Sequence, residues 1–166
     1  MADLSKTEAA ALARIETLED PGKLRVMMSN AERLGSDRVK SAAFLRLCEI
    51  QPEAEPGTVV HDVWQSIYAL EEMLKQERGR TTRLSRTRQK IARDGETGTV
   101  VDLVCRQDAS QGFTDLIERG HPELTFEAVV LRHADAFPDE ARKAARNRLQ
   151  GAGLDPDDFS KSRKGA

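Results

Sequence analysis

Residues 58–78 read TVVHDVWQSIYALEEMLKQER, and this stretch decides the fold expected for the second half of the chain. Thr58 precedes a run in which apolar residues recur at intervals of three and four, the spacing that places side chains on one face of an α-helix. That face carries Val60, Val63, Trp64, Ile67, Leu70 and Leu74. With Thr58 as the N-cap, we expect one long helix that ends near Arg78 and forms the spine of a helical domain.

Three shorter amphipathic patterns precede this helix, and capping residues mark where each begins. Their N-caps are Ser5, Asp20 and Ser36. Pro21 suits the first position of the second helix, and Gly35 suits its end. Residues 51–57 read QPEAEPG, a stretch rich in turn-forming residues. We therefore expect an N-terminal three-helix segment over residues 1–50 and a helical segment over 58–154, although both could form one domain.

The patterns after the long helix are also mainly helical. We expect helices at residues 84–94 (ending at Gly95), 110–119, 125–133 and 138–150, and a polar, disordered tail over 155–166. Residues 99–105 are rich in β-branched side chains, as are 126–131 to a lesser degree, so an α+β fold with a small hairpin from these two segments is the alternative. No turn and partner strand lie nearby, so the sequence favours an all-α bundle of about eight or nine helices with one long central helix.

The composition fits a soluble globular protein. One third of the residues are charged and 4% are aromatic, so aliphatic side chains must build the core. No apolar run approaches the roughly 18 residues of a membrane span, and no apolar leader follows Met1. We expect a cytoplasmic protein with no membrane partner.

Residues 75–93 concentrate positive charge in a chain that is otherwise acidic. They read KQERGRTTRLSRTRQKIAR, with eight basic residues and one acid, a net charge of +7. The rest of the chain carries −9. Six of the eight basic residues are arginines, which bind phosphate or guanine in a bidentate manner. Such a density of charge attracts polyanions, and nucleic acid is the commonest polyanion in a cell.

The residues in this segment predict a nucleic-acid contact in two parts. Residues 78–83, which we call the arm, offer guanidinium and hydroxyl groups for phosphates, and the following helix offers a basic face for base edges. The predicted contacts are Arg78, Arg80, Thr81, Thr82, Arg83, Arg86, Arg88, Gln89, Lys90 and Arg93. Leu84 and Ile91 lie on the opposite face of the helix. The pattern is compatible with a helix-turn-helix, and the lack of interleaved aromatic residues favours duplex DNA over a single strand.

Two other interpretations of this segment stay open. The arginines could pair with acids of the chain itself, for which the candidates are Glu71, Glu72, Glu77, Asp94 and Glu96. The protein could also be a helical adaptor that docks an acidic partner protein through the same basic surface. A homodimer is possible, because paired DNA sites match two-fold symmetry.

The sequence argues against an enzyme and predicts no cofactor. Its three histidines are not at metal-ligand spacing, and no histidine precedes His61 to complete a metal site with Asp62, so we expect no metal. No lysine has an acid two residues before it, which removes one nuclease pattern. The nucleophile elbow and the phosphate-binding glycine loops are also missing from the sequence.

Overall fold

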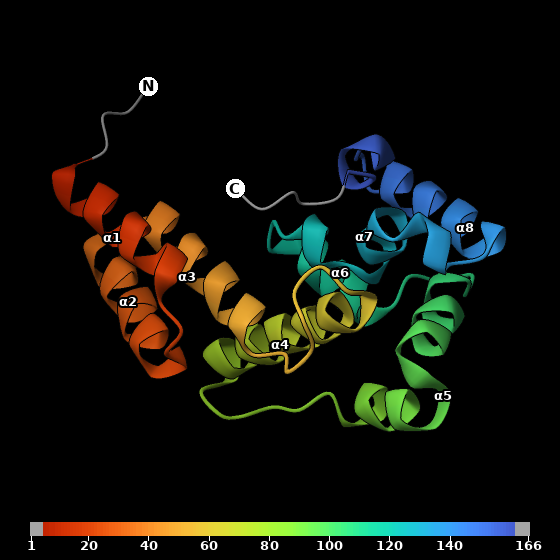
Figure 1. The fold of residues 1–166 in the computed structure, drawn as a ribbon, viewed down its shortest axis with the longest axis horizontal. Helices are drawn as coiled ribbons and strands as arrows, with labels where there is room; N and C mark the ends of the chain where they lie inside the picture. Colours follow the sequence, from red (N-terminus) through yellow and green to blue (C-terminus); the bar gives the residue numbers. More distant parts are fainter. Residues whose placement is uncertain (1–4, 162–166) are drawn as a thin grey trace. The chain divides into compact units, whose positions relative to one another are not determined.

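The structure, a computed structural model, describes residues 5–161, and all of the regular secondary structure in them is helical (Figure 1). These residues form eight α-helices and three short 3-10 helices and no strand, which confirms the expected all-α class. The alternative hairpin is wrong, because residues 99–104 and 126–131 are helical. The helices are α1 (Lys6–Thr17), α2 (Pro21–Leu34), α3 (Asp37–Ile50), α4 (Val59–Arg78), α5 (Ser85–Val104), α6 (Gln111–Glu118), η1 (Pro122–Leu124), α7 (Phe126–Arg132), η2 (Ala134–Ala136), α8 (Asp139–Gly151) and η3 (Pro156–Phe159).

The chain divides into two compact units, with the boundary between Glu53 and Ala54. In the first unit, α2 and α1 both pack against α3 (Figure 1). The apolar faces of these helices meet in a small core of aliphatic side chains with one phenylalanine. Its buried members include Ile15, Leu24, Met28, Val39, Phe44 and Leu47.

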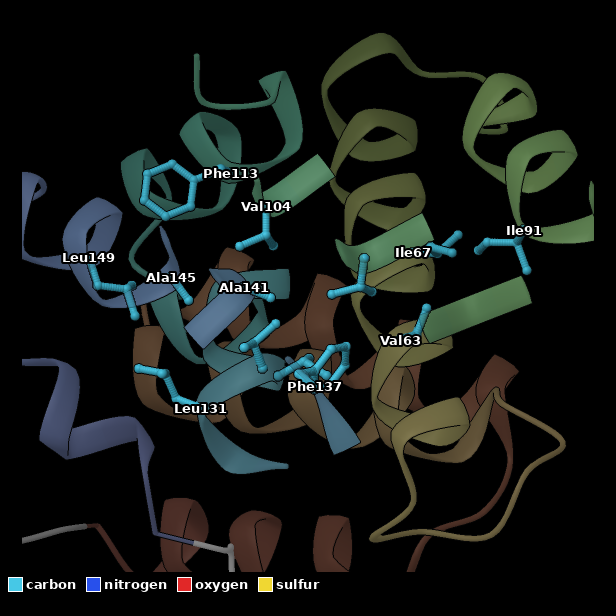
Figure 2. Packing of buried hydrophobic residues seen from close by; sticks show 13 residues of the cluster. Val63, Ile67, Ile91, Val104, Phe113, Leu131, Phe137, Ala141, Ala145 and Leu149 are labelled. Carbon is cyan, nitrogen blue, oxygen red and sulfur yellow. The ribbon is translucent and has the colours of Figure 1, made fainter. Parts of the chain in front are cut away.

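The core of the second unit is built around α7, a short helix that contacts α4, α5, α8 and all three 3-10 helices. Residues 127–131 of α7 are all buried, which explains why this segment lacks an amphipathic pattern. Figure 2 shows how side chains from α4, α5, α6 and α8 gather with Leu131 in this cluster. Each fully buried Val, Leu or Ile contributes about 1.5–3 kcal/mol relative to an exposed position.

The long helix α4 begins and ends where the sequence predicts. The Thr58 hydroxyl accepts a hydrogen bond from the His61 N–H at 3.2 Å, which caps its first turn. Gly79 follows its last residue with φ 67°, a left-handed conformation that favours glycine. Ten residues of α4 are buried, and several of them are polar.

Helix α5 joins two helical parts, and the first of them corresponds to the expected short helix over residues 84–94. Gly95 interrupts it with φ 78° and ψ 170°, but helical backbone resumes at once and runs to Val104. The first helical part of α5 therefore ends at Gly95, as the sequence predicts, and a second helical part follows directly after this kink. A separate turn before a second helix, as in a helix-turn-helix, is not formed there.

The expectation of a disordered tail from residue 155 is wrong for residues 155–161. Pro156 begins η3 and is buried, and η3 contacts α7 and α8. Asp155 caps η3 by accepting a hydrogen bond from the Asp157 N–H at 2.9 Å. The segment packs through only three apolar residues, the buried Pro156 and the half-buried Leu154 and Phe159. Its otherwise polar composition therefore gave no sign of this packing. Residues 162–166 of the predicted tail lie outside the described residues.

Within residues 5–161, no helix combines the length and the apolar character that crossing a membrane requires.

Candidate functional site

The basic segment divides into the end of α4, a non-helical arm and the start of α5. The N–H of Gly79 donates to the carbonyl of Lys75 at 2.9 Å, which closes α4. Arg78, the first residue of the arm, is the last residue of α4; residues 79–84 then follow without helix or strand, and α5 begins at Ser85. In Figure 1 this stretch is a long open connection between the two helices. From Gly79 onward the arm therefore has no regular secondary structure.

Glu71 of α4 fixes the point where the arm meets α5. Its carboxylate accepts a hydrogen bond from the backbone N–H of Leu84 at 2.9 Å. The same carboxylate accepts two bonds from Arg88, from Nε and from Nη2, each at 2.8 Å. The Arg88 guanidinium also lies over the rings of Trp64 (5.1 Å) and Tyr68 (5.5 Å), within the range of a cation–π contact.

Arg88 is therefore half-buried and already bound to an acid of the same unit. Its hydrogen bonds to Glu71 raise the pKa of its guanidinium, and its charge is compensated within the unit. The pairing of Arg88 with an internal acid was one of the open alternatives, and for this residue it is confirmed.

Two further predicted contacts, Lys90 and Arg93, also have partners inside the unit. Lys90 Nζ lies 2.9 Å from Asp94 Oδ2 and 3.1 Å from Asp102 Oδ2. Arg93 donates from Nε and Nη2 to Asp94 at 3.0 and 3.1 Å. Hydrogen bonds from Arg93 and then Lys90 lower the pKa of Asp94 to about 2. The basic face expected on this helix is therefore largely neutralised by acids on α5 itself.

The remaining predicted arginines have a different environment. They are exposed, and none forms an ion pair with a carboxylate of residues 5–161. We call them the four unpaired arginines: Arg78, Arg80, Arg83 and Arg86. Thr81 and Gln89 are exposed beside them, and Thr82 is half-buried with its hydroxyl donating to the carbonyl of Arg80 at 3.4 Å.

The nearest acid in sequence, Glu77, does not neutralise these arginines. It is bound by Arg119 at the C-terminal end of α6. Four positive charges with no counter-charge among residues 5–161 thus lie within nine residues, at the end of α4, along the arm and at the start of α5. This arrangement can hold a row of anionic groups, because guanidinium groups on exposed backbone reach phosphates in a bidentate manner.

A buried ionic cluster in the second unit was missed by the sequence analysis. Asp62 of α4 lies 2.7 Å from Nε2 of His133 and 2.8 Å from Nη1 of Arg132, and its other oxygen lies 3.3 Å from Nδ1 of His61. Burial raises the pKa of Asp62, but the hydrogen bonds from His61, His133 and Arg132 outweigh burial and hold that pKa far below its ordinary value.

The only sequence signal for this cluster was two adjacent pairs, His61–Asp62 and Arg132–His133, which are 70 residues apart. Its charges compensate one another, and Arg132 also donates to the carbonyl of Glu123 at 2.7 Å, so the cluster joins α4 to α7 and η1. In the described part of the chain, no group of three or more His, Cys, Asp or Glu residues is arranged to hold a metal ion.

Comparisons with known proteins give no guide to this site, since no family model, no curated protein and no solved structure matches the chain.

Proposed function

We propose that this chain is a non-enzymatic nucleic-acid-binding protein that binds the phosphate backbone of duplex DNA through the four unpaired arginines. The observation that carries the proposal is the contrast within the basic segment. Arg88, Lys90 and Arg93 are held by carboxylates, whereas Arg78, Arg80, Arg83 and Arg86 are exposed without one among the described residues. An unpaired guanidinium gains most from a phosphate, because it gives up no existing ion pair to bind it.

The surroundings of the arm support a duplex backbone over a single strand. Binding to single strands relies on aromatic side chains on which bases stack. The two aromatic residues closest to the arm in α4, Trp64 and Tyr68, are half-buried and covered by Arg88. They offer no open ring face for a base on the side that Arg88 covers.

The same geometry supports binding that is largely independent of base sequence. Base readout needs side chains that reach into a groove, and the expected readers Lys90 and Arg93 are engaged by Asp94. We therefore propose contact through the arm and the first turn of α5, rather than through the recognition helix of a helix-turn-helix. Gln89 is exposed and is the remaining candidate for a contact to a base edge.

The test is a fluorescence anisotropy titration of the full chain into a labelled duplex of mixed sequence at low salt. The double variant Arg80→Gln with Arg83→Gln removes two unpaired arginines. The matched control, Arg93→Gln with Arg106→Gln, also removes two exposed arginines, but both of these pair with acids, Arg93 with Asp94 and Arg106 with Asp102. We expect the first variant to bind at least about tenfold more weakly and the control to stay near the wild-type affinity.

Two results would contradict the proposal. The wild-type chain could fail to bind the duplex even at low salt, or the control variant could lose as much affinity as the first variant. The first result would leave the four unpaired arginines as a docking surface for an acidic protein partner, the second function that the charge pattern allows. The second result would show that net charge, rather than the unpaired arginines, determines binding.

A further inference from the structure

A cavity of about 770 Å³ lies in the second unit beside the arm. Helices α4, α6 and α7, the arm and both ends of α5 contribute residues to its wall. Its volume falls in the range of roughly 300–1,000 Å³ that is typical of small-molecule sites. Sites of that kind have mostly apolar walls and a few polar groups that orient the ligand.

The wall of this cavity is mainly apolar. Most of the aliphatic and aromatic side chains that line it come from α4, α6 and α7: Ile67, Leu70, Leu74, Phe113, Leu116 and Phe126. Most of them are buried in the core of the unit and expose only part of their surface to the cavity. Apolar surface of this kind is stabilised when an apolar ligand displaces water from it.

Three of the four unpaired arginines also line the cavity. Arg78, Arg83 and Arg86 contribute to the wall and are otherwise exposed, so they lie at its open side. Arg80, the fourth, is not part of the wall. The cavity therefore joins an apolar interior to a positively charged rim.

Two carboxylates line the cavity as well, but both are already paired. Asp115 lies 3.4 Å from Nη1 of Arg119 and accepts a hydrogen bond from Gln111 at 3.0 Å. Glu127 is almost completely buried and binds Nη1 of Arg148 at 2.9 Å. The uncompensated charge of the lining is thus positive.

We infer that this cavity binds a small amphipathic anion, with its apolar body between α4 and α6 and its carboxylate held by Arg83 and Arg86 at the rim. The arginines would repel the head group of a cationic amphiphile, and they would form no ion pair with a neutral one. The inference does not require that the chain binds nucleic acid, because it depends on the apolar wall together with the rim, although both proposals use Arg83 and Arg86.

The experiment is isothermal titration of the full chain with sodium decanoate, compared with decyltrimethylammonium as a ligand of similar apolar body and opposite charge. We expect decanoate to bind with a stoichiometry of one and the cation to bind at least about tenfold more weakly. Absence of decanoate binding, or equal affinity for the two ligands, would overturn the inference.

Variants locate the binding within the cavity. Leu74→Trp places a larger side chain in the apolar wall and should abolish decanoate binding. Arg83→Gln with Arg86→Gln should weaken it at least about tenfold. Arg80→Gln, on the arm but outside the wall, is the matched control and should leave the affinity within about twofold.

Full decanoate affinity in the Arg83→Gln, Arg86→Gln variant would overturn the inference, and this test does not depend on Leu74→Trp folding, because both arginines are exposed. A loss of decanoate affinity in Arg80→Gln as large as that in the Arg83→Gln, Arg86→Gln variant would also overturn the inference. Arg80→Gln should weaken duplex binding and leave decanoate binding unchanged, whereas Leu74→Trp should abolish decanoate binding and leave duplex binding unchanged. Failure of this inference and failure of the proposed function therefore give different results.

Discussion

The carboxylate of Glu71 is the contact whose removal best tests how the arm is held. It binds the Leu84 N–H and two nitrogens of Arg88, at 2.8–2.9 Å. The substitution Glu71→Gln keeps the size of the side chain and one acceptor oxygen. It removes the negative charge, so that Arg88 keeps its position over Trp64 and Tyr68 without a counter-charge.

The expected loss follows from the burial of the pair. The side chains of Glu71 and Arg88 are 12% and 24% exposed, between a surface pair and a fully buried one. Removing one partner of a buried pair costs about 3–5 kcal/mol, whereas exposed pairs contribute about 0–1 kcal/mol. Because one acceptor oxygen survives, we expect Glu71→Gln to lower the free energy of unfolding of the second unit by about 2 kcal/mol.

Urea unfolding followed by tryptophan fluorescence measures this loss selectively. The chain has a single tryptophan, Trp64, which belongs to the second unit and lies beside Arg88. The matched control is Asp157→Asn, which removes the charge of an exposed carboxylate that pairs with Arg146 at 2.8 Å. The control should change the free energy of unfolding by less than about 0.5 kcal/mol.

A loss in Glu71→Gln no larger than that of the control would refute this reasoning. It would mean that the Glu71–Arg88 contact contributes no more than an exposed ion pair does. Arg88 would then be available to an external anion, and it would belong to the contact surface after all. A double-mutant cycle with Arg88→Gln isolates the pairwise contribution.

Three further predictions concern the buried ionic cluster, the kink and the cavity. The pKa of Asp62 is lower in the folded chain than its unfolded value of 3.8, so the ionised carboxylate stabilises the fold above pH 3.8 and this contribution is lost as the pH falls below 3.8. Asp62→Asn should therefore lower the free energy of unfolding by about 3 kcal/mol at neutral pH. Urea unfolding at acid pH should show a smaller difference between the variant and the wild type. The buried Thr99 hydroxyl has no hydrogen-bond partner among residues 5–161, since Gly95 four residues earlier is not helical, so Thr99→Val should leave stability unchanged or raise it by up to about 1 kcal/mol in the same assay. Saturating decanoate should weaken duplex binding in anisotropy titrations, because decanoate and the duplex compete for Arg83 and Arg86. The weakening should be much smaller in the variant that lacks both arginines.

Helix positions were largely predictable because they are determined locally. A capping side chain accepts a hydrogen bond from an N–H three residues later, so the signal and its effect lie within one turn. Four predicted N-caps make this bond in the structure: Ser5, Asp20, Ser36 and Thr58. Ser110 and Thr125, where two further predicted helices begin, make it as well. The end of the first helical part of α5 at Gly95 was predicted on the same local grounds, and a second helical part follows it, with Val100 and Val104 packed into the core.

The state of each basic residue was not predictable from the sequence. Glu71 and Arg88 are 17 residues apart, and they meet only because the arm turns back toward α4. Asp102 reaches Lys90 only because the chain bends at Gly95, since residues twelve positions apart on one straight helix would lie about 18 Å apart. A charge count treats all eight basic residues alike, whereas tertiary contacts decide which of them keep an uncompensated charge.

The cavity and the Asp62 cluster were missed for the same reason. Each is assembled from segments that are distant in the sequence, and none of the segments has a pattern of its own that indicates the site. Asp62 and His133, for example, are 71 residues apart. Such sites become visible only when the helices are packed together.

The salt dependence of duplex binding tests the central claim most directly. With one phosphate for each of the four unpaired arginines, the slope of log K against log salt should be about −3.6, which weakens binding about 150-fold between 50 and 200 mM salt. Removing Arg80 and Arg83 should reduce the slope to about −1.8, and removing the ion-paired Arg93 and Arg106 should leave it unchanged. Equal slopes for both double variants would contradict the account, because the unpaired arginines would then have no special part in binding.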